Sequence, residues 1–173
     1  DEVFGSILNG TADENSKFNP SSPYAVTKAG AELLINSYSI TFNSDVIITR
    51  CTNNFGPRQF IEKLIPKTII LANKNLEIPI YGQGKNIRDW IFVDDHCEAI
   101  EKVLFDGKSG ESYNISANNE IDNLTIVKKI LHIMNKSDDL IHFVEDRPGH
   151  DFRYSMTSQK ISNELNWKVN TTF

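Results

Sequence analysis

The hydrophobic positions of the chain follow two alternating patterns. Apolar residues spaced three and four positions apart predict helices at 23–42, 61–73, 94–104, 124–134 and 156–167. Short apolar or alternating runs predict strands at 45–51, 76–81, 87–93, 112–115 and 141–144. The continuous apolar centre of Val46-Ile47-Ile48 is typical of a strand in a buried parallel sheet. Helices that alternate with strands in this way predict an α/β fold.

The longest predicted helix begins at Pro23. Ser22 suits the N-cap position and Pro23 the first helical position, while Asn43-Ser44 ends the helix. The residues that this helix is expected to turn toward a core are Ala25, Ala29, Leu33, Leu34 and Tyr38. Further along, Pro66 must lie in or near the first turn of its helix, and Asp94 or Asp95 is expected to cap the next one.

Composition narrows the classes of partner. The 173 residues are enough for one domain with a core, or for part of a larger one, and 39% of them are hydrophobic. A net charge of −5 argues against nucleic acid or an anionic membrane as a partner, so a local basic cluster must hold any anionic ligand. No apolar run approaches the ~20 residues of a membrane span. Cys51 and Cys97 are expected in the core, and no histidine has a partner at metal-ligand spacing, so no metal is predicted.

Tyr24 and Lys28 are the first candidates for chemistry. They are four residues apart and therefore share one face of the predicted helix. A lysine ammonium group beside a phenol stabilises the phenolate, and such a tyrosine can take a proton from an alcohol. The simpler alternative is an ordinary surface tyrosine and lysine on an amphipathic helix.

Asp1 and Glu2 are adjacent carboxylates at what reads as the end of a strand. Ligands of open α/β sheets bind at the carboxyl ends of the strands. Two carboxyl groups in one cleft can divide the work, one as a protonated acid and one as an ionised base. The alternative is a pair of solvent-exposed carboxylates without a catalytic role, and Asp1 and Glu2 taken by themselves favour this alternative.

Candidate anion-binding groups occur in three places. The loop from Asp146 to Asp151 holds Arg147 between charged and turn-forming residues, which suits bidentate binding of a phosphate. Arg88 follows a glycine turn, and Lys63 lies near a helix start whose backbone amides also favour anions. The paired amides of Asn53-Asn54 can donate and accept hydrogen bonds toward a sugar or a carboxamide. Ordinary surface cations and loop hydrogen bonds remain the alternatives.

Together these stretches resemble the dTDP-glucose 4,6-dehydratases, a family of extended short-chain dehydrogenase/reductases that use NAD. The motifs, in the order seen in that family, are Asp1-Glu2-Val3-Phe4-Gly5, Pro23-Tyr24-Ala25-Val26-Thr27-Lys28, Asn53-Asn54-Phe55-Gly56-Pro57, Glu62-Lys63-Leu64-Ile65-Pro66, Ile87-Arg88-Asp89-Trp90 and Asp146-Arg147-Pro148-Gly149-His150-Asp151. The resemblance implies the C-terminal part of a Rossmann-type parallel sheet at 1–60 and 89–115. It also implies a smaller α/β substrate-binding domain at 61–88 and 116–173.

The resemblance also implies a reaction. Bound NAD would oxidise C4 of the glucose transiently while Tyr24, aided by Lys28, removes the proton of the 4-hydroxyl. Glu2 would then abstract the C5 proton, Asp1 would protonate the departing 6-hydroxyl, and reduction at C6 would give a 4-keto-6-deoxy sugar. The residues implied to contact the cofactor are Tyr24, Lys28 and Asn54. The residues implied to contact the substrate are Asn53, Lys63, Leu64, Pro79, Ile80, Tyr81, Arg88, Asn123, Asp146, Arg147, Pro148, Gly149 and His150.

The expected partner is therefore a nucleotide sugar, dTDP-glucose or alternatively UDP-glucose, and the resemblance implies a cytoplasmic homodimer. The sequence departs from the family in three ways. No Ser-Thr precedes Asp1, Phe152 stands where the family usually has arginine, and no Gly-x-x-Gly-x-x-Gly loop for the cofactor pyrophosphate occurs in these residues. We therefore expect a fragment that is inactive alone, and a non-catalytic nucleotide-sugar-binding fragment is a further alternative.

Overall fold

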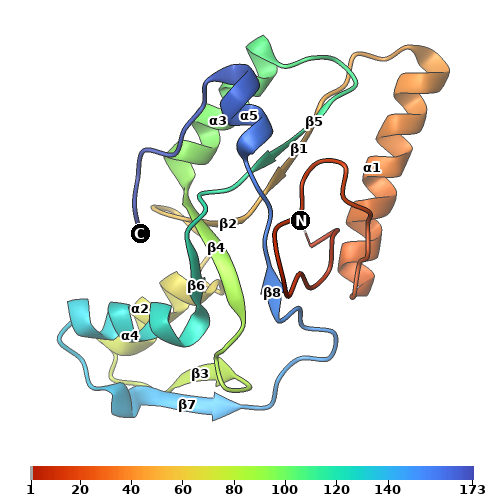
Figure 1. Ribbon diagram of the computed structural model, residues 1–173. Coiled ribbons are helices and arrows are strands. Elements are labelled where there is room, and N and C mark those ends of the chain that lie inside the picture. The colour runs from red at the N-terminus through yellow and green to blue at the C-terminus, as the bar shows by residue number, and fades with distance from the viewer. Residues whose placement is uncertain (1) are drawn as a thin grey trace.

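The computed structural model describes residues 2–173 (Figure 1). Helices α1 to α5 span Pro23–Phe42, Leu64–Asn73, Val93–Asp106, Asn123–Ile133 and Gln159–Leu165, and a 3-10 turn, η1, spans Asp138–Leu140. Strands β1 to β8 span Ile48–Cys51, Asn53–Phe55, Ile78–Tyr81, Ile87–Phe92, Ser112–Ile115, Glu120–Asp122, Ile141–Val144 and Arg153–Tyr154. All ten elements predicted from the hydrophobic pattern are present, although their bounds shift by a few residues.

Three short strands escaped prediction, and all of them pair with β4. Strand β2 pairs with β4 in parallel, β6 pairs with it antiparallel, and β8 pairs with it in parallel. Their sequences, Asn-Asn-Phe, Glu-Ile-Asp and Arg-Tyr, carry no strand pattern of their own. These strands exist because β4 offers backbone partners, which is a tertiary effect.

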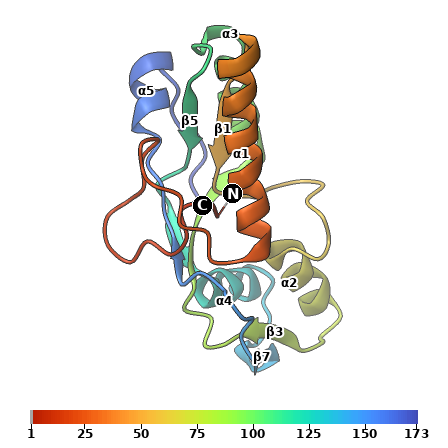
Figure 2. The same cartoon turned by 90° about the vertical axis from the view of Figure 1, so that its right-hand side faces the viewer.

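The elements are arranged around three groups of strands. In the upper part of Figure 1, β1 and β5 pair in parallel, with α1 on one side and α3 and α5 on the other. In the lower part, β3 and β7 pair in parallel beside α2 and α4. The view in Figure 2 keeps α1 and α5 on opposite sides of β1 and β5. The predicted α/β class with parallel strands is thus confirmed.

Strand β4 joins the upper and lower parts through opposite faces. Ile91 is fully buried in the upper core together with Tyr113 and Trp167. Its neighbour Trp90 packs in the lower part against Ile126 and Ile130 of α4. Successive residues of a strand point to opposite faces, so β4 contributes to two separate cores. This strand also passes beside the cavity described below.

Helix α1 begins and ends as its sequence predicts, but its buried face differs. The Ser22 hydroxyl accepts a hydrogen bond from the Ala25 amide at 3.1 Å, and Asn43 ends the helix in the left-handed conformation. Ala25 and Ala29 are buried as expected. The prediction was wrong for the three larger apolar residues, since the exposed fractions are Leu33 61%, Leu34 59% and Tyr38 52%. The helix instead buries Glu32, which pairs with Arg50 of β1.

Helix α3 begins at Val93, two or three residues earlier than a cap at Asp94 or Asp95 would place its first residue. Phe92 occupies the N-cap position, so the predicted cap at Asp94 or Asp95 was wrong. Asp95 is buried and accepts hydrogen bonds from the Asn170 and Thr171 amides at 3.1 and 2.9 Å, which ties the last residues of the chain to α3. Cys97 is exposed rather than in the core. Within residues 2–173, no helix has both the length and the apolar character needed to cross a membrane.

Candidate active site

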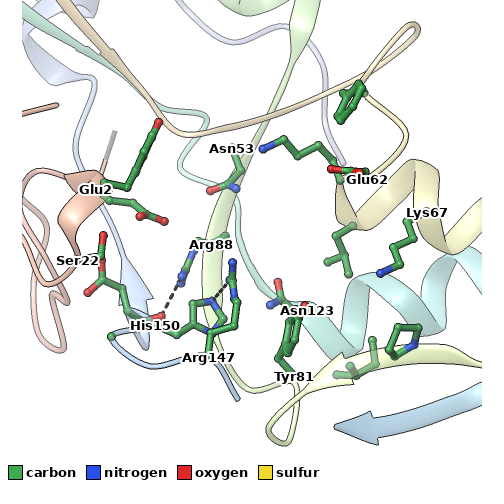
Figure 3. Close-up of a pocket in the computed structure, with 18 of the residues that line it drawn as sticks. Glu2, Ser22, Asn53, Glu62, Lys67, Tyr81, Arg88, Asn123, Arg147 and His150 are labelled. Carbon is green, nitrogen blue, oxygen red and sulfur yellow. Dashed lines mark hydrogen bonds between the residues drawn. The ribbon is translucent and has the colours of Figure 1, made fainter. Parts of the chain in front are cut away.

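A cavity of about 720 Å³ lies between the start of α1, the start of α2, the end of β3 and the loop before β8. In Figure 3, Glu2 and Ser22 lie on one side of it, Glu62 and Lys67 on the other, and Arg88, Arg147 and His150 between them. The cavity is lined by Glu2, Ser22, Tyr24, Asn53, Gln59, Phe60, Glu62, Lys63, Leu64, Lys67, Pro79, Ile80, Tyr81, Arg88, Trp90, Asn123, Arg147, Pro148, Gly149, His150 and Asp151. It therefore collects residues from across the whole chain.

Two groups capable of proton transfer face this cavity from one side. Tyr24 is the second residue of α1, and its side chain is half-exposed because the helix begins at the rim of the cavity. Glu2 precedes the buried pair Val3-Phe4 and has a positive φ of 62°. A non-glycine residue in this region is strained, and such strain often occurs at functional sites. Asp1 lies outside the described residues, so its predicted role stays a prediction.

Lys28 and Asn54, the two other residues implied to contact the cofactor, lie outside the cavity lining. The Lys28 ammonium nitrogen is 5.7 Å from the centre of the Tyr24 ring, one helical turn along α1. Asn54 of β2 is half-buried, and its amide nitrogen donates to the Thr52 carbonyl oxygen at 3.2 Å. Its Oδ1 atom is buried without a hydrogen-bond partner among the described residues. Neither Lys28 nor Asn54 lines the cavity.

Arg88 is the buried cation of the cavity, with 5% of its surface exposed. Its guanidinium donates to the Asp151 carbonyl oxygen at 2.9 Å and to its own neighbour, the Ile87 carbonyl oxygen, at 2.8 Å. Burial lowers the pKa of Arg88, against the raising effects of Glu2 and Asp151. Arginine stays protonated in proteins, so Arg88 supplies a fixed positive charge with donors still to spare.

The loop before β8 supplies the second arginine. Arg147 donates to His150 at 2.8 Å, and His150 also bonds Asp146 at 2.8 Å. The hydrogen bond from His150 and the amide of Arg147 hold the pKa of Asp146 below its ordinary value. Asp146 was expected to touch the substrate, but it does not line the cavity and instead supports His150 from behind.

The same loop is tied to the residues just before α1. The Ser21 hydroxyl donates to Asp151 Oδ1 at 2.7 Å and to the Gly149 carbonyl oxygen at 3.3 Å. Gly149 has a φ of +69°, and a Cβ atom there would lie 3.0 Å from the Ser21 carbonyl oxygen. The arginine loop and the start of the Tyr24 helix are therefore held together, although about 130 residues separate them in sequence.

Most residues named as candidates from the sequence come together in one cavity. Glu2, Tyr24 and all the expected substrate-contacting residues except Asp146 line it. Sequence reasoning missed Ser22, Gln59, Phe60, Glu62, Lys67, Trp90 and Asp151. Several of these are sequence neighbours of correctly named residues. Glu62 and Lys67, for example, lie within one helical turn of Lys63, which is a signal that could have found them.

Parallel strands covered by helices on both sides, with a Tyr-x-x-x-Lys helix beside the ligand cavity, define a Rossmann-type α/β protein. A family model described as GDP-mannose 4,6 dehydratase matches residues 1–173. The chain belongs to this family.

Curated relatives match over the complete chain. It is 47% identical over 173 residues to the low-salt glycan biosynthesis protein Agl12 of Haloferax volcanii, covering 100% of this chain and 56% of that protein. It is 44% identical to a dTDP-glucose 4,6-dehydratase of Streptomyces niveus, covering 100% of this chain and 52% of the enzyme. The chain thus spans about half the length of the curated relatives it matches.

Solved structures show the same fold. DesIV, a dTDP-glucose 4,6-dehydratase from Streptomyces venezuelae solved with NAD bound, is 41% identical with a TM-score of 0.98, over 99% of this chain and 53% of that one. A UDP-glucuronic acid 4-epimerase from Bacillus cereus, also with NAD, is 26% identical with a TM-score of 0.94, over 99% of this chain and 55% of that one. The likeness to DesIV confirms the expected Rossmann-type α/β class with parallel strands.

Proposed function

We propose that the protein containing this chain dehydrates dTDP-glucose to dTDP-4-keto-6-deoxyglucose. The observation that carries the proposal is one cavity whose lining includes Glu2, Tyr24, Arg88 and Arg147, with both arginines between Glu2 and Glu62 in Figure 3. Groups that move protons and groups that bind a diphosphate are thus within reach of one nucleotide sugar. The match to dTDP-glucose 4,6-dehydratases at 40–44% identity supports this substrate class.

Tyr24 would take the proton of the sugar 4-hydroxyl. Its hydroxyl is accessible from the cavity, and the positive charge of Lys28 at 5.7 Å from the ring stabilises the phenolate that forms. Loss of such a base typically lowers the rate by roughly 10²–10⁴. Lys28 acts through Tyr24, since it does not itself line the cavity.

Glu2 would abstract the proton at C5 once C4 is a ketone, because a carbonyl group acidifies the neighbouring carbon. It lines the same cavity as Tyr24 and lies close enough to Arg88 to raise the pKa of that guanidinium. An ionised carboxylate is the state that can accept a proton. The proposed protonation of the leaving 6-hydroxyl falls to Asp1.

Tyr24, Lys28 and Asn54 would hold the nicotinamide end of NAD. These residues fit such a group, since the Asn54 Oδ1 atom is buried without a partner in the described part of the chain and can accept a hydrogen bond. When bound, NAD supplies the transient oxidation at C4 and the reduction at C6. The chain has no Gly-x-x-Gly-x-x-Gly loop for the pyrophosphate, so we propose that these 173 residues are inactive alone.

The proposal extends to assembly, location and domain division. Large apolar residues of α1 are exposed, among them Ile40 at 87% and Phe42 at 66%, which supports a homodimer that buries this helix. Sedimentation of the protein as its gene encodes it would give its oligomeric state. We propose a cytoplasmic location, where nucleotide sugars and NAD are available. We also propose that 1–60 with 89–115 and 61–88 with 116–173 act as cofactor and substrate domains.

The test is formation of the 4-keto product from dTDP-glucose by the protein as its gene encodes it. Tyr24→Phe and Glu2→Gln should each lose at least about a hundredfold in kcat. Tyr38→Phe is the matched control, because Tyr38 has the same exposed fraction of 52% on the same helix but does not line the cavity. Equal activity of Tyr24→Phe and Tyr38→Phe would refute the proposal.

Two further assays sharpen the result. UDP-glucose should be the poorer substrate, although one methyl group on the base is worth only ~1–3 kcal/mol. The 173-residue chain with NAD and dTDP-glucose should form no product. A clear product signal from this chain would show that the missing glycine loop is not needed.

A further inference from the structure

The arginine loop contains a buried histidine between two charged side chains. His150 has only 6% of its side chain exposed. Its Nδ1 atom lies 2.8 Å from Asp146 Oδ1. Its Nε2 atom lies 2.8 Å from a terminal nitrogen of Arg147, the contact drawn in Figure 3. Arg147 itself is exposed and lines the cavity. The imidazole ring therefore connects a carboxylate outside the cavity to a cation inside it.

The chemistry of these neighbours fixes the protonation state of the ring. An ionised carboxylate only accepts hydrogen bonds, so Nδ1 must carry a proton and donate it to Asp146. A guanidinium only donates, so Nε2 must present its lone pair to Arg147. Both contacts are satisfied at once only by the neutral ring with its proton on Nδ1.

Arg147 is held from two further directions. Its guanidinium carbon is 5.0 Å from the centre of the Tyr81 ring, within the range of a cation–π contact. Its backbone amide donates to Asp146 Oδ1 at 2.8 Å, the same oxygen that His150 contacts. A cation fixed in this way has little conformational freedom left to lose when it binds an anion.

We infer that His150 is a positioning residue that aims Arg147 at the diphosphate of the substrate and does so only as the neutral, Nδ1-protonated ring. This inference rests on the proposed function. Protonation of Nε2 would set an N–H group against the N–H donor of Arg147 and place two positive charges side by side. The hydrogen bond would be lost, and Arg147 would move away from its position.

The charged groups around the ring oppose one another. Asp146 favours the protonated ring, whereas Arg147 disfavours it. The other charged groups that line the same cavity are Glu2, Glu62, Lys63, Lys67, Arg88 and Asp151.

Two matched variants separate the two hydrogen bonds of the ring. In His150→Gln the longer side chain can place its carbonyl oxygen near the Nε2 position and still accept from Arg147. In His150→Asn the amide can still donate to Asp146 but cannot reach Arg147. His142→Gln, at an exposed position on β7 outside the cavity, is the control.

We expect the KM for dTDP-glucose to rise roughly ten- to a hundredfold in His150→Asn, as for the loss of one charge-assisted hydrogen bond, with kcat nearly unchanged. The KM of His150→Gln should rise less than that of His150→Asn, because glutamine can keep the hydrogen bond to Arg147, and His142→Gln should stay within about threefold of the wild type. The wild-type KM should rise on acidification, because a protonated ring cannot accept the hydrogen bond from Arg147, and that of His150→Gln should not. Equal KM values for the Gln and Asn variants, or equal pH profiles for the wild type and His150→Gln, would overturn the inference.

A second measurement does not depend on activity. Nitrogen-15 NMR of the imidazole side chains distinguishes a proton on Nδ1 from one on Nε2, and the His150→Gln spectrum identifies the signal of His150 among the histidine signals. We expect the Nδ1-protonated form at neutral pH. A proton on Nε2 would refute the inference even in an active enzyme, whereas the expected signal without dehydratase activity would refute the proposed function alone.

Discussion

Arg50 offers the sharpest test of how this fold supports its cavity. Its guanidinium forms a fork–fork ion pair with Glu32 of α1, with nitrogen–oxygen distances of 2.7–3.1 Å, and the exposed fractions of the two side chains are 4% and 10%. The guanidinium carbon of Arg50 also lies 5.3 Å from the centre of the Phe4 ring and 5.5 Å from that of the Phe18 ring. Arg50 thus joins β1, α1 and the loop that carries Glu2.

Replacing Arg50 by methionine leaves Glu32 charged and unpaired in a buried place. Breaking a buried pair in this way typically costs ~3–5 kcal/mol, a large fraction of the ~5–15 kcal/mol that stabilises most domains. At roughly 2–4 °C per kcal/mol for a chain of this size, we expect the melting temperature to fall by about 10 °C or more. Urea denaturation of the protein as its gene encodes it gives the free energy directly.

The double variant Arg50→Met with Glu32→Leu is the decisive companion. It removes both charges and fills the space with apolar groups, so we expect it to recover most of the lost free energy of unfolding. Lys128→Met is a matched control, because its pair with Asp138 is about half-exposed on both sides and contributes less than about 1 kcal/mol. A loss below about 1 kcal/mol in Arg50→Met, or a double variant no more stable than the single one, would refute the reasoning.

Three further outcomes follow from local contacts. Ser22→Ala removes the cap of α1 and should lower the free energy of unfolding by about 1 kcal/mol in urea denaturation, whereas no change would mean that the cap is redundant. Burial raises the pKa of Glu120, but hydrogen bonds from Arg153 and Ser155 outweigh it and hold the pKa below its ordinary value. The ionised Glu120 therefore stabilises the fold at pH values above the ordinary pKa of glutamate, and this stabilisation is lost as the pH falls through the lowered pKa of the folded state. Glu120→Gln lacks this carboxylate, so its melting temperature should fall less on acidification than that of the wild type. Gly84→Ala would bring a Cβ atom within 2.9 Å of side-chain atoms on both sides at a φ of +69°, whereas Gly10→Ala at +73° meets nothing within 4 Å. Thermal melts should therefore rank Gly84→Ala well below Gly10→Ala, and equal melting temperatures would show that the crowding relaxes.

Prediction from the sequence was most reliable where the residues that start or end a helix lie within that helix or next to it. The start of α1 could be predicted because Ser22 and Pro23 are suited to the first turn whatever surrounds them. The prediction failed at the start of α3. The Asp95 carboxylate accepts hydrogen bonds from the backbone amides of Asn170 and Thr171, so it does not cap its own helix. Residues about 75 positions away decided that outcome.

In the candidate site, too, the sequence indicated the kinds of reactive group, whereas their arrangement depends on distant segments. The types and spacing of Glu2, Tyr24, Arg88 and Arg147 pointed to proton transfer and anion binding before their positions were known. Their convergence on one cavity could not be read from spacing, since the loop of Arg147 meets the start of α1 through hydrogen bonds of Ser21 that cross about 130 residues. The family resemblance implied a substrate contact for Asp146, whereas in the structure Asp146 does not line the cavity and contacts His150 instead.

The sequence by itself determined the helices, the longer strands and the identity of the reactive groups, because periodicity, capping and side-chain chemistry act within a few residues. The tertiary structure decided which of those residues are buried, as with Glu32 in place of Leu33 and Leu34. It also decided the short strands on β4 and the paired contacts of His150. The physical reason is that burial and hydrogen-bond pairing depend on which distant segments meet, and that depends on the free energy of the whole fold.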